Sequence, residues 1–240
     1  MSRRALWFLP RAAFSAALLA VLIPAGCRSL PGTRTEPFVL QTGDLLFQDL
    51  NGDPFSEAVA RVTTGYRGAV LTHVGIAAET NGGEIVVLEA FTEGVAATPL
   101  EEFLGRSLDG EGRPKVLVGR LEPRYRRLIP GAVAAAFARL GKPYDDVFEI
   151  DNDAYYCSEL VYACFREAGG GADLFQLTPM TFLDPETGET FPAWAEYFAD
   201  LGVPVPEDRP GLNPGGISRS PVLEIVHAYG EPAGWDPGGK

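Results

Sequence analysis

The sequence predicts an α+β protein in which an antiparallel sheet packs against helices. Residues 72–79 (THVGIAAE) and 84–91 (EIVVLEAF) have the composition of strands, and the turn residues Thr80–Gly83 between them are typical of a hairpin. Helical and strand patterns do not alternate regularly along the chain, which disfavours a parallel α/β sheet. A length of 240 residues suffices for one domain with a substantial core.

The first half of the chain contributes a strand, a helix and the hairpin. The apolar run at residues 43–48 predicts a short strand. Asp53 as N-cap and Pro54 at the first helical position predict a helix that ends at Val62. The hairpin follows, and a short helix is expected at 99–104.

The second half is predicted to contain more helix. The apolar segment 115–121 predicts a strand, and a helix is expected from about Arg124 to Leu140, before Gly141 and Pro143 interrupt the pattern. The last elements are a helix near 194–201 and a strand at 222–229.

An amphipathic helix is predicted to begin at Cys157. Its apolar residues recur at helical spacing on one face, namely Cys157, Leu160, Val161, Cys164, Phe165 and Ala168. This stripe should pack against the sheet, so the Cys157 thiol should point toward the sheet from the first turn. A thiolate is stabilised there by the free N–H groups and the partial positive charge of a helix start.

The N-terminal residues predict export. Residues 1–27 combine early arginines, an apolar run at 12–25 and the ending Ile-Pro-Ala-Gly-Cys, which resembles a bacterial lipobox with Cys27 as the lipidated residue. Arg28 after this cysteine favours a lipoprotein of the outer membrane, facing the periplasm. The alternative is a plain secretory signal cut nearby. Residues 28–40 are then expected to be a tether, and residues 41–240 a single folded domain.

Composition and cysteine spacing exclude several functions. A net charge of −12 argues against nucleic acid as a partner, because phosphate neutralisation needs a basic surface. The Cα atoms of Cys157 and Cys164 are about 10 Å apart along one predicted helix, which is too far for a disulfide. Cys164, at an apolar helix position, is expected to be a core residue. With only two histidines in the chain, a metal site is not expected, and neither is a cofactor.

A histidine and a glutamate fall on one face of the predicted hairpin. A register centred on Asn81 places His73 directly opposite Glu89, whereas a slip of one residue would separate them onto opposite faces. With Cys157 they form a candidate Cys–His–Glu triad. Taken singly, Cys157 could be core filler and His73 a strand residue bonded to a carbonyl. Glu89 is harder to explain, because ionised carboxylates are rarely buried alone. The other histidine, His227, lacks a comparable partner.

Four segments in this order, THVGI, LEAF, GKPYD and YYCSELVY, resemble the YiiX-like, circularly permuted branch of the NlpC-type papain-like cysteine hydrolases. The resemblance implies a circularly permuted papain-like fold. It implies that Cys157 is the nucleophile, His73 the base and Glu89 the group that orients His73. Tyr144 would contribute to the oxyanion site with the Cys157 N–H, and Tyr156 would shape the pocket wall.

These observations together predict a cell-envelope thiol hydrolase that cleaves an amide or peptide bond through an acyl-thioester. The expected partners are a small peptide, amide or lipid acyl substrate, and a membrane bound through the N-terminal lipid. Two alternatives stay open: a lipid acyl hydrolase or acyltransferase on the same scaffold, and a non-catalytic envelope binding protein. Aromatic residues between 170 and 197 suit either a lipid slot or a core.

Overall fold

The computed structural model describes residues 37–50, 52 and 54–238. The chain divides into two units, residues 1–37 and 38–240, and every helix and strand reported below belongs to the second. The predicted export signal with Cys27, most of the tether and the Asp53 cap lie outside the described residues. Within the described part, no helix combines the length and the apolar character that crossing a membrane requires.

A six-stranded sheet organises the domain, with the strand order β4-β3-β2-β1-β5-β8. All neighbouring strands are antiparallel, which confirms the predicted α+β class. The strands are β1 (Leu45–Gln48), β2 (His73–Glu79), β3 (Ile85–Phe91), β4 (Gly94–Pro99), β5 (Val116–Leu121) and β8 (Leu223–Ala228). A small second sheet pairs β6 (Thr178–Pro179) with β7 (Pro210–Gly211).

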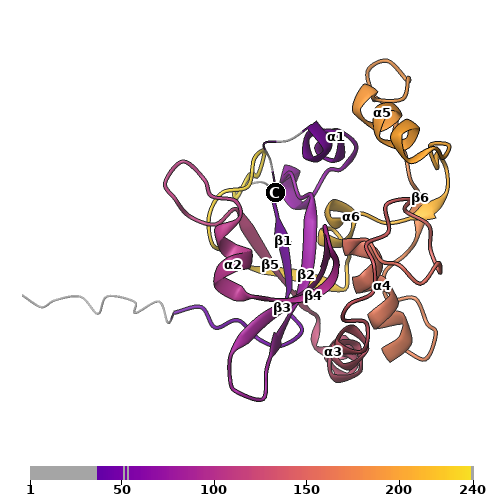
Figure 1. Cartoon of the computed structure of the whole chain (residues 1–240). Coiled ribbons are helices and arrows are strands. Elements are labelled where there is room, and N and C mark those ends of the chain that lie inside the picture. Colours follow the sequence, from indigo (N-terminus) through magenta and orange to yellow (C-terminus); the bar gives the residue numbers. More distant parts are fainter. Residues whose placement is uncertain (1–36, 51, 53, 239–240) are drawn as a thin grey trace, which may run out of the picture. The chain divides into compact units, whose positions relative to one another are not determined.

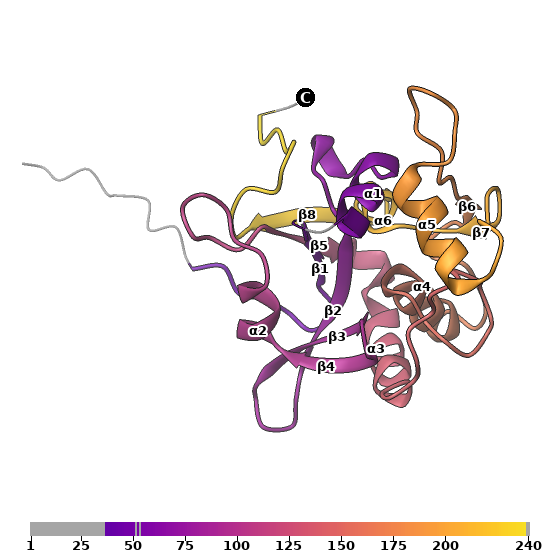
Figure 2. The ribbon, with the colours of Figure 1, turned by 45° about the horizontal axis from the view of Figure 1, so that its top comes forward.

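Helices lie on both sides of the six-stranded sheet. The α-helices are α1 (Pro54–Val62), α2 (Leu100–Gly105), α3 (Ile129–Ala138), α4 (Cys157–Ala168), α5 (Pro192–Leu201) and α6 (Pro214–Ser218). Two 3-10 turns, η1 (Tyr66–Gly68) and η2 (Pro123–Leu128), complete the set. In Figures 1 and 2, α3 and α4 lie on one side of the sheet and α2 on the other.

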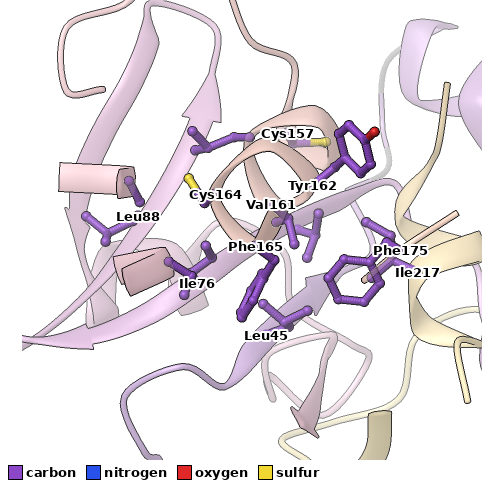
Figure 3. Close-up of a cluster of buried hydrophobic side chains, with 14 of the residues drawn as sticks. Leu45, Ile76, Leu88, Cys157, Val161, Tyr162, Cys164, Phe165, Phe175 and Ile217 are labelled. Carbon is purple, nitrogen blue, oxygen red and sulfur yellow. The ribbon is translucent and has the colours of Figure 1, made fainter. Parts of the chain in front are cut away.

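Alternation along the strands divides the core between the two faces of the sheet. Leu45, Ile76 and Leu88 are fully buried under α4, and Figure 3 shows Val161 and Phe165 of that helix among them. On the other face, a second buried cluster gathers around α2, formed by Leu46, Ala77, Val87, Phe103 and Val116. The predicted packing of the Cys157 helix against the sheet is therefore what the structure shows.

The observed elements do not all match the predicted ones, and the short elements β6, β7 and α6 were not predicted. Strand β4 was not predicted, because its sequence GVAATP is poor in β-branched residues and ends in proline. The expected helix from Arg124 to Leu140 begins as the 3-10 turn η2, and α3 starts only at Ile129. Pro130 lies in the first turn of α3, where proline suits the start of a helix better than its interior.

The hairpin register predicted from an Asn81 centre is wrong by two residues. The observed pairs are Ile76↔Leu88 and Glu79↔Ile85, which centre the hairpin on Gly82. Residues 80–84 connect the two strands. The Thr80 N–H donates to the Glu84 carbonyl at 2.8 Å, which continues the same register into the turn. A shift of two residues preserves the face of every side chain. His73 and Glu89 therefore remain on one face but stand diagonally, with Gly75 opposite Glu89.

Gly94, where β3 turns into β4, is predicted to be intolerant of any side chain. Its φ of +114° is unfavourable for other residues, and an added Cβ would lie 2.2 Å from the Lys142 carbonyl oxygen. Gly94→Ala should therefore lower the free energy of unfolding by roughly 2 kcal/mol or more, measured by urea denaturation.

Gly82→Ala is the matched control, since its Cβ would meet only Thr80 Oγ1 at 3.6 Å in an exposed turn. Its unfolding free energy should stay within about 0.5 kcal/mol of the parent. Equal stability of the two variants would contradict the close approach of the β3–β4 turn to Lys142.

Candidate active site

The helix α4 begins at Cys157 because the residue before it is extended. Tyr156 has φ −87° and ψ 166°, and its N–H donates to the Glu159 carboxylate at 3.4 Å. The first N–H groups of a helix have no partner within the helix, so the Cys157 N–H points out of the helix start. Cys157 is buried, and it lines two cavities described below.

His73 and Glu89 form a buried hydrogen bond between adjacent strands. His73 Nε2 lies 2.6 Å from Glu89 Oε2, and the two residues are 3% and 0% exposed. The diagonal contact passes Gly75, where even a Cβ would lie 2.4 Å from Val87 Cγ1. The absence of a side chain at position 75 therefore leaves room for the imidazole and the carboxylate to meet.

Glu89 is held ionised by further donors besides His73. Arg106, directly after α2, donates two hydrogen bonds to the carboxylate at 2.8 and 2.6 Å, and Thr98 of β4 donates a third. Burial alone would raise the pKa of Glu89, but these bonds and the His73 ring lower it to about 2. The carboxylate is thus a fixed negative charge behind the imidazole.

The Cys157 thiol and the His73 ring line the same cavity and lie close enough for each to shift the pKa of the other. The Nε2 atom of the ring faces Glu89, which leaves Nδ1 as the nitrogen available to the thiol. Burial opposes the charge on both groups. The bonds to Cys157 and Glu89 nevertheless raise the pKa of His73 to about 9, and the ring, Ser158 and the Val74 N–H hold the pKa of Cys157 below its ordinary value. The arrangement favours a thiolate–imidazolium pair.

The helix and the imidazole approach each other from opposite faces of the sheet. Val74 and Ile76 point toward α4, so His73 and Glu89 point toward α2 by the alternation of the strands. His73 is the first residue of β2, and its ring lies 5.8 Å from that of Phe103 in α2. The thiol and the ring therefore do not meet within the layer between α4 and the sheet. The thiol meets the ring at the end of β2.

Two tyrosines border the thiol. Tyr144, from the Gly-Lys-Pro-Tyr turn, lines the cleft on both sides of Cys157, and burial raises the pKa of its phenol well above the usual value. Its hydroxyl therefore stays protonated and is able to donate. Tyr156 is 3% exposed and its hydroxyl accepts the Leu212 N–H at 3.4 Å, so its ring serves as cavity wall.

Two cavities meet at Cys157. The smaller, of about 180 Å³, extends over Phe148 and Trp194. The larger, of about 650 Å³, contains His73, Arg106 and Asp146. Four residues border both, and these are Val59, Thr72, Tyr144 and Cys157. The sulfur thus lies where a substrate spanning the two cavities would place its central bond.

The remaining candidate residues lie apart from this cleft. The ring of His227, on β8, stacks on Phe38 at 4.0 Å between centroids. Cys164, on α4, is fully buried in the core cluster between that helix and the sheet, and burial raises the pKa of its thiol to about 12. Among the described residues, no three His, Cys, Asp or Glu side chains are grouped as metal ligands would be.

The sequence pattern did not identify Arg106, Thr98 or Gly75. Thr98 lies on β4, opposite Val87 of β3, and composition did not predict β4 as a strand. Arg106 follows the short helix α2, and no recognisable sequence motif surrounds it. The available signal was Glu89 itself, because a carboxylate in an apolar strand requires a cationic or hydrogen-bonding partner.

Comparisons with known proteins agree with this architecture. A family model described as a permuted papain-like amidase enzyme, YaeF/YiiX, C92 family, matches residues 39–227. The uncharacterized protein YiiX of Escherichia coli (strain K12) is 30% identical over 143 residues, which cover 59% of this chain but only 64% of that relative. The crystal structure of metalloprotein YiiX from Escherichia coli O157:H7 matches with a TM-score of 0.61 at 24% identity, covering 78% of this chain and 97% of that one.

The solved structure, at this level of identity, supports the fold alone. The family model extends from before β1 to near the end of β8 and includes His73, Glu89 and Cys157. The predicted resemblance to permuted papain-like hydrolases is confirmed by it. The chain therefore belongs to the YaeF/YiiX, C92 family of permuted papain-like cysteine amidases.

Proposed function

We propose that the protein hydrolyses an amide or peptide bond through an acyl-thioester on Cys157, with His73 as base and acid and Glu89 as the orienting carboxylate. The observation that carries this proposal is the position of the His73 ring. One ring nitrogen bonds the buried Glu89 carboxylate at 2.6 Å, and the Cys157 thiol lines the same cavity as the ring, which lowers the pKa of that thiol. An imidazole between a thiol and a carboxylate supports thiol-based acyl transfer.

The reaction begins when the Cys157 sulfur attacks the substrate carbonyl carbon. The thiol proton resides on His73, and the new S–C bond converts the carbonyl oxygen to an oxyanion. Collapse of this intermediate breaks the C–N bond, and His73 returns the proton to the leaving amine. Water, deprotonated by His73, then attacks the thioester, which releases a carboxylic acid and regenerates the thiol.

Two donors are available for the oxyanion. The Cys157 N–H points out of the start of α4, and the protonated Tyr144 hydroxyl borders the same part of the cleft. Together they would bind the developing negative charge from two directions. Loss of one donor of this kind typically lowers kcat by about 10²–10³-fold.

Arg106 and Thr98 act as positioning residues for the base. They hydrogen-bond both oxygens of Glu89, so the carboxylate stays ionised and its orientation is fixed. Glu89 in turn fixes the rotation of the imidazole and stabilises its positive charge, as the carboxylate of a catalytic triad does.

We place this activity in the cell envelope. Residues 1–27 have the pattern of an export signal ending in a lipobox-like sequence at Cys27. On this proposal the mature protein begins with an acylated Cys27, residues 28–40 connect it to the hydrolase domain, and the outer membrane holds it facing the periplasm. A small peptide, amide or lipid acyl compound of the envelope is then the substrate.

The hydrolytic function predicts a strict requirement for the sulfur. Incubated with muropeptides, simple acyl amides and phospholipids, the full chain should acylate Cys157, seen as a mass increase of the peptide carrying that residue. Cys157→Ala should lower hydrolysis at least 10³-fold, because the covalent pathway is lost.

Cys164→Ala is the matched control for this variant, since that thiol is buried in the core and contacts no cleft. It should retain activity once circular dichroism has shown it folded. Full activity of Cys157→Ala on every substrate that the parent cleaves would exclude the proposed mechanism.

The ion pair predicts an unusual pH dependence of thiol alkylation. Because the pKa of Cys157 is lowered and that of His73 is raised to about 9, Cys157 has a larger thiolate fraction at pH 7 than an ordinary cysteine, and this fraction declines as pH falls through the lowered thiol pKa. Iodoacetamide should therefore label Cys157 rapidly at pH 7, measured by peptide mass.

In His73→Gln the stabilising charge is absent while the burial remains, so labelling of Cys157 should require pH above the ordinary thiol pKa of about 8.5. Cys164 should stay unlabelled in both proteins below pH 9. An unchanged labelling profile in His73→Gln would rule out the pair.

The lipoprotein assignment predicts acylation at a single cysteine. Expressed in a two-membrane bacterium fed a radioactive fatty acid, the chain should incorporate label and fractionate with the outer membrane, and Cys27→Ala should incorporate none. Cys164→Ala, which leaves the lipobox-like sequence unchanged, should incorporate label normally. Unlabelled parent protein released into the periplasm would instead indicate a plain secretory signal.

A further inference from the structure

We propose that the smaller cavity beside Cys157 binds the acyl portion of the substrate, and that this acyl group is uncharged, apolar and about six carbons long. The inference rests on the proposed function, because it takes Cys157 as the nucleophile and His73 as the acid. It adds which side of the scissile bond each cavity receives, and the chemistry of the group bound there.

The position of the acid decides the direction of the substrate. His73 must deliver a proton to the leaving amine, so the leaving group lies on the side of the imidazole. His73 lines the larger cavity and is not among the residues lining the smaller one, whereas Cys157 lines both. The amine therefore departs through the larger cavity, and the acyl group bonded to the sulfur extends into the smaller.

The smaller cavity is built for carbon. None of the described residues that line it is Asp, Glu, Lys or Arg. Its apolar wall comes from α1, from α5 and from the loops between α3 and α6, and includes Val62, Phe148, Met180, Phe182, Trp194 and Leu212. The polar residues in its lining are uncharged serine, threonine, asparagine and tyrosine side chains. Burying an ionised carboxylate in such surroundings is costly without a paired charge. An acyl group that carries a charge is therefore disfavoured.

Aromatic packing makes this wall rigid. The rings of Phe182 and Trp194 meet edge to face at 5.0 Å between centroids, and Phe148 meets Trp194 in the same way at 5.9 Å. Such pairs stabilise one another beyond their buried area. The cavity is thus preformed, and binding does not have to organise its wall.

The size of the cavity sets the length of the group. Its volume of about 180 Å³ is close to that of an apolar protein cavity of roughly 150 Å³ that binds benzene. A six-carbon chain or a phenyl ring fills that space. Longer chains gain less, because additional methylenes extend beyond the enclosed part.

The larger cavity differs from the smaller one in charge. Asp146, His73 and Arg106 line it beside apolar residues such as Leu50 and Phe91, and its volume of about 650 Å³ admits a bulky group. Arg106 is already bonded to Glu89, whereas Asp146, which accepts a hydrogen bond from the Tyr197 hydroxyl, has no ion-pair partner among the salt bridges of the described residues. The substrate is accordingly an uncharged, apolar acyl group on an amine whose leaving half is able to carry polar or charged groups.

The test uses acyl amides of one fluorogenic aminocoumarin with the full chain. Acetyl, butyryl and hexanoyl amides should show kcat/KM rising about fourfold per methylene, the gain expected for burying each CH₂. The adipoyl amide matches hexanoyl in length but ends in a carboxylate, and it should react at least tenfold more slowly. Mass measurement of the Cys157 peptide gives the rate of thioester formation independently.

Filling the cavity should remove the preference. Val62→Phe introduces a ring from α1 into the smaller cavity, and the ratio of hexanoyl to acetyl turnover should fall about tenfold or more. Arg61→Phe adds the same ring to the exposed side of α1, lining neither cavity, and should keep the parental ratio. Thr178→Phe, at an exposed rim position, repeats the test should Val62→Phe fail to fold.

The possible outcomes distinguish failure of the acyl-cavity proposal from failure of the proposed hydrolase function. Thioester formation at equal rates for acetyl, hexanoyl and adipoyl amides would overturn the acyl cavity and leave the hydrolase intact. A parental ratio in Val62→Phe and Thr178→Phe would overturn it as well. Absence of turnover and of thioester with all amides and with muropeptides would overturn both proposals.

Discussion

The buried carboxylate of Glu89 is the constraint on which the site depends. A fully buried negative charge is tolerated only with partners, and three side chains provide them: His73, Thr98 and Arg106. These come from β2, β4 and the residue after α2, so the charge ties together elements that are distant in sequence. Because Glu89 stays ionised, the imidazole beside it is oriented and favours its protonated form, which in turn favours the thiolate.

The thiol and the imidazole come together at the end of the sheet where β2 begins. The helix that carries Cys157 packs on one face, and the His73–Glu89 pair lies on the other. His73 is the first residue of β2, and its side chain, on the face that carries α2, reaches the first turn of α4 at this edge. This position also leaves the sulfur open to solvent-accessible cavities on both sides, which a site within the layer between helix and sheet would lack.

The two cavities give the proposed chemistry a direction. Phe148 from the loop after α3, Phe182 from the loop before α5 and Trp194 from α5 form one aromatic cluster. This cluster forms the apolar wall beside the thiol. The larger cavity includes charged side chains in its wall, namely Arg106 and Asp146, beside the imidazole. An asymmetric cleft of this kind distinguishes the two halves of a substrate by desolvation, since charge is readily hydrated in one cavity and excluded from the other.

The sequence by itself determined the local features of this protein. Strand periodicity placed His73 and Glu89 on one face, and a two-residue error in register left that result unchanged because the period is two. The apolar stripe located the start of α4 at Cys157, which the structure confirms. Only the tertiary structure decided the rest. The turn that sets the register, the β4 strand carrying Thr98, the approach of Arg106 and the face on which α4 packs all depend on contacts between distant segments. Such contacts leave no periodic trace in a single sequence.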